Sequence, residues 1–269
     1  SHGNKGDEWK IQDESPGDGW TKDTDTFDTW FSSGQWPFIT LGFPDSPDFK
    51  TFYPTTIMET GADLIFFWVS RMIMLGLYRT GKAPFKYVYL HGMVRDAKGR
   101  KMSKSKGNVI FPLDVSNEYG TDALRMGLIV GNTPGTDLNL DPQKIGAYKK
   151  FANKLWNIAR FVLLQERSGG IKTEIKAEFD AMAKDVTDDI EHHRIYMAAE
   201  KLYHYVWDRF AAEIIEESKG KKECGATLHY ILENSLKLLH PFMPFITEEI
   251  WSSLPDKKGL IMVEAWPRL

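Results

Sequence analysis

The spacing of hydrophobic residues changes at Lys144, and this change divides the chain into two kinds of structure. Before it, residues 26–143 alternate short runs of aromatic and β-branched residues with apolar helical stretches, punctuated by Gly and Pro. Such alternation is typical of α/β units with a parallel sheet. After it, apolar residues recur every three or four positions, as helices require. The sequence therefore predicts a partial parallel-sheet α/β domain over residues 26–143 and an all-α helical bundle over residues 144–269.

One strand–helix–strand unit stands out in the α/β part. Tyr53–Glu59 and Tyr87–Val94 are the strand candidates, and the apolar stretch Leu64–Leu77 predicts a buried core helix between them. We expect the Asp63 carboxylate to cap the first turn of that helix. Ligands of open α/β sheets bind beyond the carboxyl ends of strands and at helix N-termini. A nucleotide is therefore the expected ligand beside Gly61, Asp63, His91 and Gly92.

The all-α part is predicted to contain three or four helices with short connections. The first begins near Lys144, a second covers about residues 186–217, a third covers about 226–239, and a short helix follows Pro244. Residues 1–25 are polar, rich in Gly and Asp, and without a sustained period. We expect them to form a loop, either the end of a missing insertion or, at Ser1-His2, the remnant of a removed purification tag.

Composition excludes several classes of protein. With 269 residues, 42% hydrophobic and 26% charged, the chain is neither disordered nor of low complexity. Cys224 is the only cysteine, so no intrachain disulfide can form, and a reducing, cytoplasmic location is expected. Leu64–Leu77 is too short to cross a bilayer and carries Arg71, so no membrane association is expected. The net charge of −3 gives no global attraction to nucleic acid, and any such binding must come from local clusters.

The densest charge cluster runs over residues 95–106, RDAKGRKMSKSK, with six cations against Asp96 alone. Gly99 and Gly107 allow this loop to bend. Ammonium groups, hydroxyls and free backbone N–H groups on a bending loop suit a polyphosphate whose charge shifts during a reaction. A solvated basic loop without a ligand is the alternative, and for a generic run of cations it is the better one.

The specific string Lys101-Met102-Ser103-Lys104-Ser105 changes that balance, because KMSKS resembles the signature loop of class I aminoacyl-tRNA synthetases. The flanking strings resemble the valyl branch of this family over roughly 245 residues from Asp25 onward: DTWFSSGQWPF (28–38), FYPTTIMETGADLIFFW (52–68), HGMVRDAKGRKMSKSKGNV (91–109), NKLWN (153–157) and HPFMPFITEEIW (240–251). The isoleucyl branch is the alternative, and residues 31–33 and 64–68 favour valine.

The resemblance implies a ligase that joins valine to its tRNA with ATP through a valyl-adenylate, and a fold that is the second half of a Rossmann-like catalytic domain followed by an anticodon-binding bundle. Lys101 and Lys104, assisted by Ser103 and Ser105, would stabilise the departing pyrophosphate. It further implies an adenylate site at Gly61, Asp63, His91, Gly92, Met93 and Val94, a valine pocket at Trp30, Leu64 and Trp68, and tRNA contacts at Lys149, Lys150 and Lys154. Mg²⁺ is expected to arrive with ATP, no metal is expected on the protein itself, and we expect a monomer.

The chain also departs from the family pattern. The second signature, H-x-G-H, is absent from its 269 residues, as are the editing insertion and the C-terminal coiled coil, and Thr136 stands where the family commonly has Arg. We therefore expect the isolated chain neither to activate valine nor to edit. Two other hypotheses remain: a tRNA-binding module without catalysis, and a nucleotide-binding regulatory domain with a helical, partner-binding tail.

Overall fold

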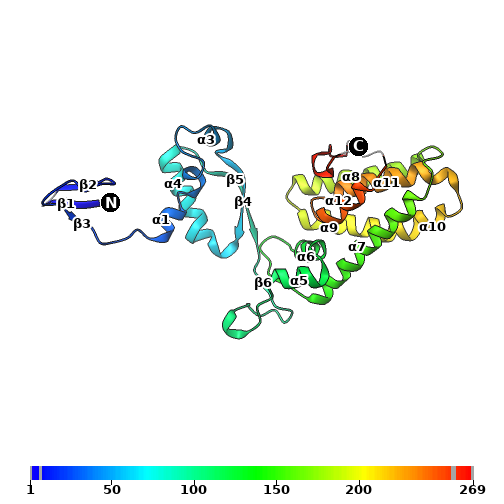
Figure 1. Cartoon of the computed structure of the whole chain (residues 1–269), viewed down its shortest axis with the longest axis horizontal. Helices are drawn as coiled ribbons and strands as arrows, with labels where there is room; N and C mark the ends of the chain where they lie inside the picture. Colours follow the sequence, from blue (N-terminus) through cyan, green and yellow to red (C-terminus); the bar gives the residue numbers. More distant parts are fainter. Residues whose placement is uncertain (1, 6–7, 256–258, 268–269) are drawn as a thin grey trace. The chain divides into compact units, whose positions relative to one another are not determined.

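The structure is a computed structural model that describes residues 2–5, 8–255 and 259–267. The chain forms two compact units, residues 1–90 and 91–269. Figure 1 shows the elements of both units along the chain. Within the described residues, no helix combines the length and the apolar character that a membrane crossing needs.

The first unit begins with a three-stranded sheet in the order β2-β1-β3. β1 (His2–Lys5) pairs antiparallel with β2 (Glu8–Ile11) and with β3 (Thr21–Lys22). The expectation of a loop over residues 1–25 is therefore wrong. The side chains of β2 are all exposed, so no alternation of apolar and polar residues marks the strand, and backbone pairing forms the sheet.

The α/β part of the first unit follows the short helices α1 (Thr29–Ser33), α2 (Trp36–Ile39) and α3 (Pro47–Phe52). β4 (Thr55–Gly61) pairs with β5 (Phe85–His91), and the crossover between them consists of η1 (Ala62–Leu64), η2 (Ile65–Val69) and α4 (Ser70–Thr80). The Thr55 N–H donates to the Pro84 carbonyl, so both strands begin at the same edge, as parallel strands do. The predicted strand–helix–strand unit is confirmed, with both strands displaced by about two residues.

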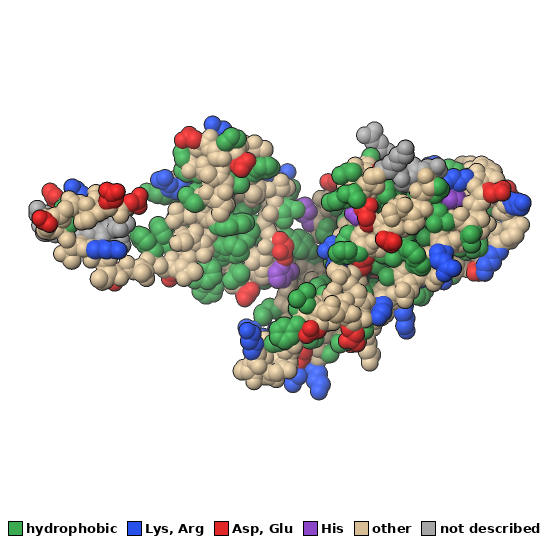
Figure 2. All heavy atoms as spheres, in the orientation of Figure 1, with side chains coloured by type: hydrophobic (Ala, Val, Ile, Leu, Met, Phe, Trp, Pro, Cys, Tyr) green, Lys and Arg blue, Asp and Glu red, His purple; other side chains and the backbone are tan. Residues whose placement is uncertain are grey.

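The crossover helix is not the buried core helix that its apolar sequence predicts. Met72 and Val69 are buried against Met58 and Phe85 of the two strands. On its other side Phe66 is 81% exposed and Tyr78 is 83% exposed. Figure 2 shows hydrophobic side chains at the surface of this unit. Exposed apolar side chains of this size are disfavoured by water, and where they gather they mark interaction sites.

The second unit opens with a small parallel pair and the basic loop. β6 (Val94–Arg95) pairs with β7 (Leu138–Asn139) in the register Val94↔Leu138 and Arg95↔Asn139. Between these strands lie η3 (Lys104–Lys106), α5 (Pro112–Tyr119) and α6 (Thr121–Ile129). Val94, placed in the second long strand by its sequence, thus belongs to a separate strand, because the chain breaks at Gly92 and Met93.

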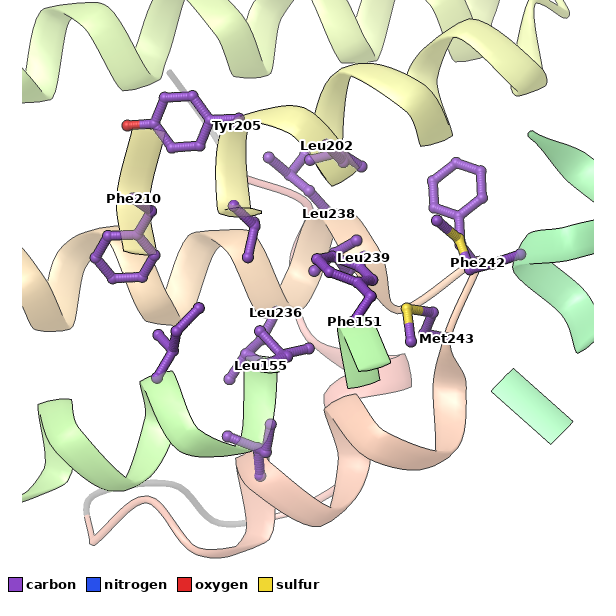
Figure 3. Close-up of a cluster of buried hydrophobic side chains, with 14 of the residues drawn as sticks. Phe151, Leu155, Leu202, Tyr205, Phe210, Leu236, Leu238, Leu239, Phe242 and Met243 are labelled. Carbon is purple, nitrogen blue, oxygen red and sulfur yellow. The ribbon is translucent and has the colours of Figure 1, made fainter. Parts of the chain in front are cut away.

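The remaining elements form the helical bundle that the periodicity predicts. Its elements are α7 (Pro142–Leu163), α8 (Thr173–Glu191), α9 (Ile195–His204), η4 (Tyr205–Ile214), α10 (Ile215–Ser218), η5 (Lys222–Cys224), α11 (Gly225–Leu239), α12 (Pro244–Ser252) and η6 (Ile261–Val263). Figure 3 shows how side chains from α7, α9, η4 and α11 meet in its core. Phe151 and Phe210 are fully buried there. Each such side chain contributes about 2–3 kcal/mol through burial.

The helix expected over residues 186–217 is wrong at its beginning. Residues 186–191 end α8, and α9 begins only at Ile195. His193 adopts a left-handed backbone with φ 61°, and the buried Asp189 carboxylate accepts from Arg194 Nε at 2.7 Å. Because the turn contains neither Gly nor Pro, the sequence offers no break signal at this point.

Gly146 lies inside α7, where glycine costs helix stability. A Cβ at this position would meet only the Tyr119 ring, at 3.5 Å, which is an ordinary contact. We therefore expect Gly146→Ala to raise the free energy of unfolding by about 1 kcal/mol, because alanine loses less backbone entropy in a helix. Urea unfolding followed by circular dichroism tests this, and an unchanged or lower stability would contradict it.

Candidate functional site

The residues proposed for the adenosine end are divided between the two units, and the first unit carries Gly61 and Asp63. Gly61 is the buried last residue of β4, and Asp63 lies exposed in η1. The capping role expected for Asp63 is wrong: the N-cap position of η1 is Gly61, which has no side chain that could accept the capping hydrogen bond. The carboxylate stays at the carboxyl end of β4, where a parallel sheet presents polar groups to a ligand.

Trp30 and Trp68, proposed for the amino-acid pocket, lie on adjoining elements of the first unit. Asp28 caps α1 by accepting from the Trp30 N–H at 2.7 Å, and Trp68 Nε1 donates to the Ser33 carbonyl at 3.0 Å. The Trp30 ring lies 5.9 Å from that of Phe67 and 5.6 Å from the Arg71 guanidinium. These contacts fix α1 against the crossover.

Trp30 lines a pocket of about 340 Å³ with Asp28, Phe31, Arg71, Met74 and Leu75. Leu64 and Trp68 are half-buried outside its lining. Within the described residues, Arg71 Nη1 is buried without a hydrogen-bond partner. Of the three residues predicted for the valine pocket, the structure thus places Trp30 at a hollow, with Trp68 on the element beside it.

In the second unit, Gly92 approaches another backbone segment too closely for any side chain. A Cβ at Gly92 would lie 1.9 Å from the Thr136 carbonyl oxygen. Beside this contact, the Met93 N–H donates to Asp137 Oδ1 at 2.8 Å and the Leu138 N–H donates to the Met93 carbonyl at 2.9 Å. The segment around Thr136 therefore shapes this site through its backbone, whatever side chain position 136 carries.

Asp137 secures the same strand end and was not singled out from the sequence. Its carboxylate accepts from the Met93 N–H and from Arg95 Nε at 2.5 Å. Both bonds hold the pKa of Asp137 below its ordinary value, and the bond from the Met93 N–H has the larger effect. His91 Nδ1 lies 2.8 Å from the Gly92 carbonyl oxygen. His91, Gly92, Met93 and Val94 thus form one continuous segment, held against residues 136–138.

Asp96 organises the base of the basic loop. Oδ1 accepts from the Lys98 and Arg100 N–H groups at 3.0 and 2.8 Å, and Oδ2 accepts from Arg100 Nε at 2.8 Å and from Asn108 Nδ2 at 2.9 Å. Asp96 is buried, with 6% of its surface exposed. Hydrogen bonds hold the pKa of this carboxyl far below its ordinary value. The bond from the Asn108 amide has the largest effect, followed by the bond from the Arg100 N–H. The sequence shows Asp96 only as the one anion in a basic run, although Asp-x-x-Gly is a turn pattern.

Asn108 ties the KMSKS segment back to this base. Its Oδ1 accepts from the Ser103 N–H at 3.0 Å, and its Nδ2 donates to the Lys101 carbonyl at 3.3 Å as well as to Asp96. Gly107 closes η3 with φ 62°, a conformation that favours glycine. The Ser103 and Ser105 hydroxyls lie 3.2 Å apart. The loop is therefore a short turn fixed at both ends, not the interior of a helix.

Lys101 and Lys104 are exposed on this turn. Within the described part of the chain, no carboxylate lies within ion-pair distance of either ammonium group, because Asp96 is paired with Arg100 at 2.7 Å. Figures 1 and 2 show the loop beyond β6 and the cationic side chains on it. A fixed turn with unpaired cations provides pre-organised positive charge, which suits a polyphosphate.

Asp96 also predicts a dependence of stability on pH. Its folded pKa is depressed, so its stabilising contribution is complete above the unfolded pKa near 4 and is lost as pH falls towards the folded pKa. We expect Asp96→Asn to destabilise the loop at neutral pH, since an amide NH₂ would face other donors. The difference from wild type should be constant above pH 5 and shrink below pH 4. Urea unfolding at a series of pH values tests this, and a difference that grows in acid would contradict it.

The string HPFMPFITEEIW forms a structural junction. Asp122 of α6 accepts from the Ile246 and Phe245 N–H groups at 2.7 and 3.3 Å, and so caps α12. Arg125 donates to the carbonyls of Pro241 and Phe242 at 2.8 and 3.1 Å. Burial raises the pKa of Asp122 and lowers that of His240. These bonds join α6 to the end of the bundle within the second unit.

The lysines proposed for tRNA contacts lie in the middle of α7. Lys149 Nζ donates to the Glu118 carbonyl at 2.8 Å, and Lys154 Nζ lies 5.7 Å from the Trp207 ring centroid. Lys150 is exposed between them. Two of the three cations thus have contacts within the second unit. Among the described residues, no group of three His, Cys, Asp or Glu side chains is arranged to hold a metal ion.

Comparison with protein families matches both parts of the chain. Residues 3–141 match the family described as tRNA synthetases class I (I, L, M and V), and residues 172–269 match the anticodon-binding domain of tRNA ligase. Valine–tRNA ligase from Geobacillus kaustophilus is 45% identical over 96% of this chain and 32% of its own length, and that from Clostridium acetobutylicum is 44% identical over 91% and 30%. The chain thus spans about a third of the length of these relatives. They confirm the resemblance to the valyl branch.

Solved structures show the same fold. The LeuRS–tRNA–LeuAMS ternary complex from Agrobacterium radiobacter K84 superposes with a TM-score of 0.81 and 25% identity, covering 95% of this chain and 34% of that one. The Mycobacterium tuberculosis methionyl-tRNA synthetase in complex with methionyl-adenylate has a TM-score of 0.68 and 21% identity, covering 82% of this chain and 48% of that one. The predicted parallel-sheet α/β part followed by a helical part is therefore confirmed.

Proposed function

Because the chain belongs to the class I tRNA synthetases of the isoleucyl, leucyl, methionyl and valyl group, we propose that it is part of a valine–tRNA ligase. The reaction joins valine to its tRNA in two steps, with valyl-adenylate and pyrophosphate formed from valine and ATP in the first. We propose that this chain supplies the pyrophosphate clamp, part of the adenylate and valine sites, and the anticodon-binding bundle.

The observation that carries this proposal is the pre-organised turn of residues 101–107. The Asp96 and Asn108 side chains make six hydrogen bonds at its base, two of which reach Lys101 and Ser103, while Lys101 and Lys104 stay exposed and unpaired with any described carboxylate. Formation of the adenylate moves negative charge onto the departing pyrophosphate, and fixed cations at that position lower the barrier. The Ser103 and Ser105 hydroxyls would donate to the same oxygens. Mg²⁺ would enter with ATP, as it usually does with polyphosphates.

The remaining site residues would bind and orient the reactants. Asp63 is an exposed carboxylate that can accept from the two ribose hydroxyls, and the Gly61 backbone permits close approach. The segment from His91 to Val94 would read the adenine edge with its backbone. Trp30, with Trp68 and Leu64 nearby, would contact the valine side chain. These are positioning tasks, which need no nucleophile on the protein.

The tRNA is the proposed macromolecular partner. The match of residues 172–269 to an anticodon-binding domain supports this, and Lys149, Lys150 and Lys154 would contribute phosphate contacts. The apolar surface at Phe66 and Tyr78 supports a chain that works as part of a larger protein. We propose that this larger protein is a monomer.

A grafted enzyme tests the proposal. The matched segment of Geobacillus kaustophilus valine–tRNA ligase is replaced by this chain, and valine-dependent ATP–pyrophosphate exchange is measured. We expect exchange that strongly prefers valine to isoleucine, and none from the isolated chain. The Clostridium acetobutylicum segment, grafted identically, is the positive control. If that control is active while a folded graft of this chain is inactive or prefers isoleucine, the proposed function is wrong.

A further inference from the structure

A second pocket of the first unit, of about 340 Å³, combines aromatic side chains with three cations. Its lining consists of Phe43, Phe49, Lys50, Tyr53, Arg79, Thr80 and Lys82. None of these residues belongs to the proposed catalytic machinery. We name it the α3–α4 pocket, because its cations come from α3, from the last turn of α4 and from the turn that follows α4.

The aromatic side of the α3–α4 pocket is rigid. The Phe49 ring stacks on Tyr53 with centroids 4.8 Å apart, and Phe43 meets Phe49 edge-on at 5.0 Å. The Tyr53 hydroxyl donates to the Lys82 carbonyl oxygen at 2.9 Å and lies 2.9 Å from the Thr80 hydroxyl oxygen. These bonds fix the turn that carries Lys82, so the ring surface and the cation are positioned together before any ligand arrives.

The cations of this pocket are free of ion pairs within the described part of the chain. Within the described residues, no carboxylate lies within ion-pair distance of Lys50, Arg79 or Lys82, and Arg79 instead lies over the Phe43 ring at 5.6 Å. The surrounding unit is acidic, with eight Lys and Arg against twelve Asp and Glu in residues 1–90. Three unpaired cations therefore converge on one hollow of a unit whose other charges are mostly negative.

One effect opposes anion binding here. The C-terminal end of α4 points its carbonyls towards this region and contributes about half a negative charge. Two of those carbonyls are already satisfied, since Gly76 accepts from the Thr80 hydroxyl at 2.8 Å and Leu77 accepts from the Gly81 N–H at 2.9 Å. Three full positive charges outweigh this partial charge, so the pocket favours an anion.

We propose that the α3–α4 pocket binds one nucleotide, with the base against the aromatic side chains and the phosphate among the three cations. Aromatic faces and guanidinium planes receive bases, while lysines receive phosphates, in sites for single-stranded nucleic acid. The volume suits one nucleotide, since ligand pockets begin near 300 Å³. A free mononucleotide and one residue of an RNA strand share this chemistry, and the experiment separates them.

The test measures binding of two probes to the full 269-residue chain at low salt: AMP by calorimetry, and a fluorescein-labelled single-stranded RNA octamer by anisotropy. We expect Lys50→Gln/Arg79→Gln/Lys82→Gln to weaken binding at least tenfold. For the octamer, the slope of log K against log salt should fall by about 0.7, since the pocket holds one phosphate and each phosphate contact contributes about that amount. Loss with both probes identifies a mononucleotide site, and loss with the octamer alone identifies an RNA site.

Three matched variants make the result specific. Lys10→Gln/Lys22→Gln/Lys86→Gln removes the same charge from the same unit outside the pocket and should leave binding within twofold. Lys101→Gln/Lys104→Gln removes the proposed catalytic cations. In this background the pocket variant should weaken binding by the same factor as in the wild type, so a failure of the pocket proposal is distinguished from a failure of the proposed function. Phe49→Leu should weaken binding about tenfold with an unchanged salt slope. If the pocket variant and its charge-matched control bind both probes equally, the proposal is overturned.

Discussion

Replacing Lys104 by alanine in the grafted ligase is expected to lower kcat for valine activation by about 10²–10³, with little change in KM for valine. The ammonium group acts on charge that develops on the departing pyrophosphate, so its loss affects the transition state more than the bound substrate. Lys101→Ala should behave alike. The double variant should lose less than the product of the two losses, because groups that act on one charge are not additive. ATP–pyrophosphate exchange at saturating ATP measures this.

Lys98→Ala is the matched control for this loss. Lys98 is exposed on the same loop, but its N–H is bound to Asp96 at the base and it stands outside the KMSKS turn. Its removal changes the loop charge by the same amount and should lower kcat by less than threefold. If Lys98→Ala equals Lys104→Ala, the lysines act only through the overall charge of the loop, and the role proposed for the turn is wrong.

The position of this loop could be predicted from sequence, but the bonds that hold it could not. The KMSKS string and its glycines indicate a bending, basic loop, and the structure places the string in an exposed basic turn. Asp96 and Asn108 stabilise it through hydrogen bonds between residues four to twelve positions apart. Hydrophobic periodicity does not predict such bonds, because they depend on where side-chain oxygens and N–H groups meet after folding.

Helices with an apolar face were predicted well where their partners lie within the chain. α7 and α11 bury the residues that their periodicity marks, including Leu155 and Leu236, because the rest of the bundle covers them. α4 has the same apolar character, and yet Tyr78 within α4 and Phe66 in the adjoining η2 are exposed. Periodicity thus predicts that a face is apolar, but not what covers it. The strands at the N-terminus show the converse, since backbone pairing needs no apolar face.

The contact between Gly92 and Thr136 leads to the second large effect. Gly92→Ala is expected to lower the free energy of unfolding of the second unit by about 3 kcal/mol, because its Cβ would lie 1.9 Å from one backbone oxygen and 2.6 Å from the Asp137 nitrogen. For a unit of this size, that corresponds to a melting temperature about 6–12 °C lower. Gly170→Ala is the control: a Cβ there meets nothing within 4 Å, so stability should stay within about 0.5 kcal/mol.

Thr136→Gly, combined with Gly92→Ala, separates a backbone clash from a side-chain clash. The atoms that the alanine Cβ would meet are the carbonyl oxygen and carbon of Thr136, and glycine retains both. We therefore expect no recovery of stability in the double variant. The displaced segment would also strain the bond from the Leu138 N–H to the Met93 carbonyl, which belongs to the proposed adenine side, so valine activation by the graft should fall with stability. Full recovery in the double variant would show that the Thr136 side chain, not its backbone, requires a glycine at position 92.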